Sequence, residues 1–227
     1  MRIFALFLAT GLISASNLFA QVTSYHFNFH SGAGLLKASK HRDFKELWSS
    51  GYNISGGFTY ELSDEIEVGL CAEHHRFPVN ESRAAELAQS MGAIDLLERQ
   101  DISVTTLSLL FRINCYGIEN KFEAYLLFTL GWAWPNGAFV SATDDDGDFL
   151  VALPFPEERQ ETISFGTGID RNISKSAGLF IELTYRIIYL RETELYIDYP
   201  RPVPMWPETH HADFYRLAAG LRYSLRY

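Results

Sequence analysis

Two pairs of adjacent histidines stand near residues that could take part in acid–base chemistry: His74–His75 and His210–His211. Glu73 precedes the first pair and Ser82 follows it, so the side-chain types of a hydrolytic triad occur close together in the chain. Such a triad is recognised by its geometry, because the serine must meet the imidazole and the imidazole must meet the acid. The spacing matches no known catalytic motif, and we predict no catalytic residue here.

A run of acidic residues, Asp144-Asp145-Asp146-Gly147-Asp148, offers the oxygen ligands that Ca²⁺ prefers. It lacks the ligand spacing and the distal bidentate glutamate of an EF-hand loop. We therefore expect a solvated acidic loop, with Ca²⁺ binding as the alternative. No metal site and no cofactor is predicted.

The other charged residues belong to segments with a regular pattern, which is clearest in the last stretch, Tyr215 to Tyr227. Its odd positions are apolar or aromatic, and its even positions are small or charged. A period of two predicts a β-strand with one apolar and one polar face.

Seven earlier segments show the same alternation, and long and short connections separate them in turn. The predicted segments are Tyr25–Gly34, Tyr52–Leu62, Ile66–Arg76, Ile102–Cys115, Phe122–Trp132, Thr162–Asn172 and Ala177–Tyr189. In the long connection Pro78–Gln100, Asn80 could cap a short helix through Ala84, Leu87, Ala88 and Met91. The long connection Pro135–Gln160 is expected to be an acidic loop. The sequence thus predicts an all-β fold, an eight-stranded antiparallel up-and-down barrel.

Volume decides which face of these strands points inward. Eight strands enclose an interior just wide enough for side chains, and the comparable core of a (β/α)₈ barrel holds about twelve. The apolar face carries far more large side chains than that. We therefore expect it to face lipid, as in a transmembrane β-barrel with short periplasmic turns and long outer loops.

The polar face would then line the lumen, where charges of both signs can pair. We expect Glu182 to pair with Arg186 and Arg222, and Glu67 to pair with Arg112. The predicted lumen charge network consists of Glu67, Glu73, Arg112, Glu123, Glu182, Arg186 and Arg222. Such pairing favours a plugged lumen over a pore.

The ends and the composition of the chain limit the remaining possibilities. Residues 1–20 read as a signal peptide, with an early positive charge, an apolar stretch and Ala20 before the expected cut, which leaves residues 21–227 as one barrel domain. Cys71 and Cys115 fall on opposite faces of neighbouring strands, so we expect two free thiols. The net charge of −9 argues against nucleic acid as a partner.

The alternating final strand with its terminal aromatic residue resembles the assembly signal of bacterial outer-membrane barrels, here Tyr223, Leu225 and Tyr227. The whole mature chain resembles the OmpA/OmpX-type barrels, and the passage from Asp43–Trp48 into Gly51–Gly57 is similar to a loop-to-strand passage in that group. The resemblance implies that the protein is located in the outer membrane of a Gram-negative-type bacterium. The implied partners are membrane lipid, lipopolysaccharide and the barrel assembly machinery, and the implied oligomeric state is a monomer.

The resemblance says little about activity, and three functions stay open. We favour a non-enzymatic barrel with a structural or surface-interaction role through its outer loops. The alternatives are a narrow pore or conduit for small molecules and a lipid-A-modifying enzyme that would use a histidine such as His74.

Overall fold

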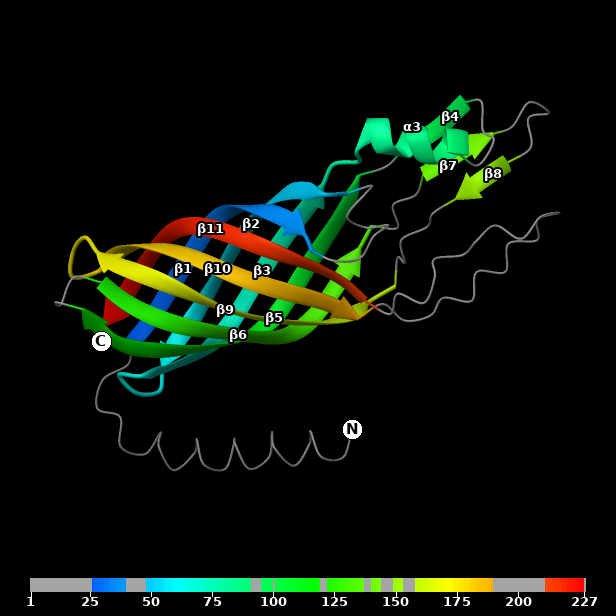
Figure 1. Cartoon of the computed structure of the whole chain (residues 1–227). Coiled ribbons are helices and arrows are strands. Elements are labelled where there is room, and N and C mark those ends of the chain that lie inside the picture. Colours follow the sequence, from blue (N-terminus) through cyan, green and yellow to red (C-terminus); the bar gives the residue numbers. More distant parts are fainter. Residues whose placement is uncertain are drawn as a thin grey trace.

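The computed structural model describes residues 26–39, 48–90, 95–99, 101–118, 122–136, 140–143, 149–152, 158–189 and 211–226. Within these ranges eight long strands close into a barrel in the order β1-β11-β10-β9-β6-β5-β3-β2 (Figure 1). The strands are β1 (His26–Ala38), β2 (Ser50–Glu61), β3 (Ile66–Phe77), β5 (Ile102–Ile118), β6 (Phe122–Pro135), β9 (Gln160–Asn172), β10 (Ala177–Tyr189) and β11 (His211–Arg226). Every neighbouring pair is antiparallel, which confirms the predicted eight-stranded up-and-down barrel.

The outer surface of the barrel is apolar on all sides. Each strand contributes large exposed hydrophobic side chains, for example Leu35, Ile54, Leu70, Leu109, Leu126, Phe165, Ile181 and Leu221. An apolar belt without interruption would be covered by lipid, and a closed barrel leaves no unpaired strand edge inside a bilayer. We therefore treat the barrel as membrane-spanning. No helix among the described residues is long and apolar enough to cross a membrane.

Two contacts between a cation and an aromatic ring lie near the two ends of this belt on β6. The guanidinium of Arg171 lies 5.4 Å from the ring centre of Phe122, and that of Arg159 lies 5.6 Å from the ring centre of Trp132. About ten residues of a strand tilted by roughly 40° rise about 25 Å, which is the height of the apolar band in membrane barrels. We therefore infer that the two ring contacts lie near the two membrane interfaces.

Several strands extend further toward the long connections than the alternation predicted. β1 continues to Ala38 and β11 begins at His211, whereas Gly34 and Tyr215 were the expected ends. In these extensions inward-facing positions are also apolar, as at Leu36 and Phe214, so the alternation disappears while the strand pairing continues.

The long connections carry structure of their own beyond the barrel (Figure 1). Helix α3 (Glu81–Ser90) begins as predicted: the side chain of Asn80 accepts a hydrogen bond from the backbone N–H of Arg83. A separate sheet in the order β4-β7-β8 joins β4 (Asp95–Arg99), β7 (Val140–Thr143) and β8 (Phe149–Ala152). The expectation of a plain loop over 135–160 was therefore wrong.

The short turns and the C-terminus lie at the opposite end of the barrel (Figure 1). We call this the inner end, and the end with α3 and the separate sheet the outer end. The predicted signal peptide, residues 1–20, lies outside the described residues.

Candidate functional site

Four charged side chains near the outer end of the lumen form one ion-pair group, which we call the outer cluster: Glu73, Glu182, Arg186 and Arg216. Both oxygens of the Glu73 carboxylate are engaged, Oε2 by Arg186 and Oε1 by Arg216. Arg216 also donates to Glu182. No side chain of the group is more than 12% exposed. Two positive and two negative charges thus balance in a buried place, as burial requires.

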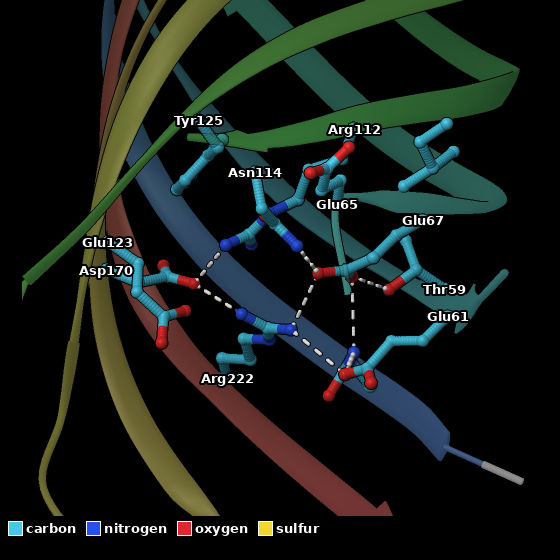
Figure 2. A network of polar contacts seen from close by, with 12 residues as sticks. Thr59, Glu61, Glu65, Glu67, Arg112, Asn114, Glu123, Tyr125, Asp170 and Arg222 are labelled. Carbon is cyan, nitrogen blue, oxygen red and sulfur yellow. Dashed lines mark hydrogen bonds and ion pairs between the residues drawn. The ribbon is translucent and has the colours of Figure 1, made fainter. Parts of the chain in front are cut away.

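A second group, the inner cluster, lies toward the inner end and contains Glu61, Glu67, Arg112, Asp170 and Arg222 (Figure 2). Asp170 Oδ2 accepts hydrogen bonds from Arg112 at 2.5 Å and from Arg222 at 2.6 Å. Arg222 also donates to Glu67 Oε1 at 2.8 Å. Neutral side chains complete the coordination of Glu67: Thr59 donates to it at 2.5 Å and Asn114 at 3.0 Å.

Tyr125 joins the two clusters. Its hydroxyl donates to Glu182 at 3.0 Å, and the guanidinium of Arg112 lies 3.7 Å from its ring centre. The ring has room because Gly168 stands opposite on β9, where a Cβ atom would come within 2.3 Å of the ring. Glycine is required here by this close approach.

An apolar layer fills the space beside Tyr125. It contains Cys71, Leu110, Leu127 and Phe180, and the Phe180 ring lies against Gly32 and Gly220. The cavity between this layer and the inner cluster measures about 20 Å³ and is lined by Asn28, His30, Thr59, Glu67, Leu110, Arg112, Leu127, Phe180, Glu182 and Arg222. That volume holds about one water molecule.

The outer end of the lumen is closed by a hydrophobic cluster that we call the mouth plug. Its buried members are Leu36, Ala38, Trp48, Phe77, Ala84, Ile102, Val104, Ala133, Ile188, Ala212 and Phe214. The rings of Phe77 and Phe214 meet edge to face at 5.1 Å. Ala84 comes from α3, so the outer helix is anchored in the plug.

The structure places the predicted lumen residues as follows. Glu67, Glu73, Arg112, Arg186 and Arg222 are buried inside the barrel, and Glu182 is half-buried there. Glu123 belongs to neither cluster; it lies half-buried at the inner end, where Asn172 donates to it at 3.4 Å.

One predicted pair is present and one is wrong. Arg112 lies 3.4 Å from Glu67, as expected. Glu182 does not pair with Arg222 or Arg186; its partner is Arg216. The register explains this, because Glu182 stands opposite Ala218, two residues from Arg216, whereas Arg222 stands opposite Gly178.

The predicted network also omitted Glu61, Arg216, Asp170 and Tyr125. Asp170 follows Ser164, Gly166 and Gly168 on the inward face of β9, so continuing that alternation by one step would have found it. Its two arginine partners come from other strands and could not be read from that pattern.

The residues considered for catalysis do not form a triad, although His75 Nε2 lies 3.8 Å from Glu73 Oε2 in the lumen. His74 is exposed on the outside of the barrel, where its Nδ1 lies 3.1 Å from Thr105 Oγ1, while Glu73 points into the lumen. Ser82 is exposed on α3. Within the described ranges no group of three or more histidine, cysteine or acidic residues could hold a metal ion.

Other predicted features are placed only in part. Tyr223 is exposed on the outer face and Leu225 is half-buried, while Tyr227, His210 and the acidic run Asp144–Asp148 lie outside the described residues. Cys71 is buried and Cys115 is exposed, and both are free, as expected from their opposite faces.

The solved structures to which this chain is similar include outer-membrane proteins. No protein-family model matches the chain, and no curated protein matches its sequence. Neisserial surface protein A is 10% identical, with a TM-score of 0.47 over 89% of this chain and 99% of that one. OprG from Pseudomonas aeruginosa is 14% identical, with a TM-score of 0.46 over 88% and 95%. The outer-membrane protease OmpT from Escherichia coli is 9% identical, with a TM-score of 0.36 over 90% and 98%.

The names of these structures include a surface protein and a protease, and one fold can host many functions. With TM-scores below 0.5, the chain's own strand pairing remains the basis for its fold, and its function depends on its own site.

Proposed function

We propose that this protein is a non-enzymatic outer-membrane barrel with a closed lumen, which holds its outer segments rigidly at the cell surface for interaction. The barrel supplies the fixed base. Helix α3 and the sheet β4-β7-β8 are the parts that reach beyond the barrel at its outer end (Figure 1).

The filled lumen is the observation that carries this proposal. From the inner to the outer end it contains the inner cluster, the apolar layer with Tyr125, the outer cluster and the mouth plug. A conducting pore needs a continuous wet path, whereas the cavity between the apolar layer and the inner cluster holds about one water molecule. The interior therefore supports a scaffold rather than a conduit.

The proposed setting follows from the outer face and the C-terminal strand. We place the barrel in the outer membrane after removal of residues 1–20, with lipid and lipopolysaccharide around the apolar belt. The barrel assembly machinery would recognise Tyr223, Leu225 and Tyr227. A closed barrel has no free strand edge to pair with a second copy, so we expect a monomer.

Single-channel recording tests the closed lumen. Purified barrel is reconstituted into planar bilayers near neutral pH, and its insertion is verified by the altered gel mobility of the folded form. A known open porin serves as the positive control. We expect no conductance steps from the inserted wild-type protein; regular steps that scale with the amount inserted would favour the pore.

A further inference from the structure

His75 lies at the boundary between the outer cluster and the mouth plug. It is fully buried on the lumen face of β3, with its ring 5.1 Å from that of Phe214 in the plug. On its other side, Nε2 lies 3.8 Å from Glu73 Oε2. Neither ring nitrogen makes a hydrogen bond within the described part of the chain.

The carboxylate nearest to His75, that of Glu73, already binds two arginines. The facing charged groups are Glu73 on its own strand, Arg186 on β10 and Arg216 on β11. Its cross-strand neighbours on β2 and β5 are Asn53 and Val104, which are uncharged, and His74 faces outward. Since the outer cluster already balances two arginines with two glutamates, a proton on His75 would bring a third positive charge and leave the buried group with a net charge.

A net charge in a dry interior is costly, and hydration lowers that cost. Water can reach His75 from the outer end only if the mouth plug separates. Protonation would therefore favour a state in which the plug is open.

Asn53 is a second, independent group whose burial in the closed mouth is unfavourable. It stands opposite His75 on β2 and is 1% exposed. Neither its side-chain nitrogen nor its oxygen has a hydrogen-bond partner among the described residues. A buried amide without partners costs free energy that hydration would recover, so opening relieves Asn53 as well as a charged His75.

We propose that the outer mouth of this barrel opens in acid, with His75 as the group whose protonation releases the mouth plug. The lumen is closed near neutral pH. Acidification admits water past Phe77 and Phe214 as far as the outer cluster, while the barrel wall stays intact. This response goes beyond a static scaffold, because the packing of α3 against the mouth plug through Ala84 would then depend on the pH outside the cell.

A thiol placed inside the plug tests the proposal. Val104 stands opposite His75 and is 1% exposed, so Val104→Cys reports on the plug. Cys71→Ala and Cys115→Ala remove the native thiols. The rate of reaction with dithiodipyridine, which works in acid, is measured from about pH 7.5 to about pH 4.5 and divided by the rate for the urea-unfolded protein at each pH.

We expect this ratio to rise at least about tenfold toward acid, because one proton linked to opening can raise the open population up to about tenfold per pH unit. His74→Gln, one residue away on the outer face, should keep the rise. His75→Gln should abolish it while the circular dichroism of the barrel is unchanged in all variants.

Three results would overturn the proposal. One is a flat ratio in the parent protein, and another is an equal rise in His75→Gln. The third is a rise that accompanies loss of the β-sheet spectrum, since the whole barrel would then be unfolding.

Discussion

At the scale of single residues, the stability of the lumen depends on charges that compensate one another. Glu73 illustrates this, because it is the acceptor for both Arg186 and Arg216 and has a side-chain exposure of only 2%. Removing one partner from a buried ion-pair group leaves charge without compensation, which costs more than the pair itself contributes.

Glu73→Gln should therefore lower the free energy of unfolding by about 3–5 kcal/mol, since two guanidiniums would be left with Glu182 alone. Urea unfolding in phospholipid vesicles measures the change. Arg83→Gln is the matched control, because Arg83 pairs with Glu86 on the exposed surface of α3, where a pair is worth about 0–1 kcal/mol. Similar losses in the two variants would show that the outer cluster is not a dry ion-pair group.

The sequence predicted which residues line the lumen better than it predicted which of them form ion pairs. Alternation assigns Glu67, Glu73 and Arg112 to the inward face, because successive side chains of a strand point to opposite faces regardless of how the strand pairs with its neighbours. The contact of Glu73 with Arg216 joins residues 143 positions apart in the chain. It depends on how the strands are staggered around the closed barrel, which local pattern does not contain.

At the scale of strands and helices, the apolar–polar alternation predicted the eight barrel strands. It did not predict the outer ends of these strands, where the inward-facing residues are no longer polar, or the short strands beyond the barrel. Near the outer end the inward residues become apolar, so β1 and β11 run on past the end of the alternation. The strands β4, β7 and β8 are at most five residues long, too short to show a period. Asn80 was found from sequence because capping is a local interaction.

The position of a residue along β6 should decide how well it tolerates charge. Phe128 is exposed to lipid near the middle of the apolar belt, and Trp132 lies at its outer edge. We expect Phe128→Arg to cost about 2–4 kcal/mol of folding free energy in vesicles, and the charge in Trp132→Arg to cost about 0–1 kcal/mol. Equal losses of folding free energy in the two variants would contradict the inferred position of the membrane boundary near Trp132.

At the scale of the whole molecule, the long and short connections assign the two ends of the barrel to opposite sides of the membrane. Ser82 is exposed on α3 and Ser174 is exposed in the turn between β9 and β10. In a protein without its native cysteines, Ser82→Cys should react with an impermeant maleimide on intact cells, and Ser174→Cys only after the cells are opened. The reverse labelling pattern would invert the topology.

The central claim is that the barrel interior is a dry, ion-paired core and not a water-filled channel. A double-mutant cycle on Glu182 and Arg216, from urea unfolding of Glu182→Ala, Arg216→Ala and the double variant, tests it most directly. A buried, charge-assisted pair predicts a coupling free energy of about 2–3 kcal/mol, with the double variant recovering part of the loss. A coupling of about 0–1 kcal/mol, as for a pair screened by water, would contradict the closed core.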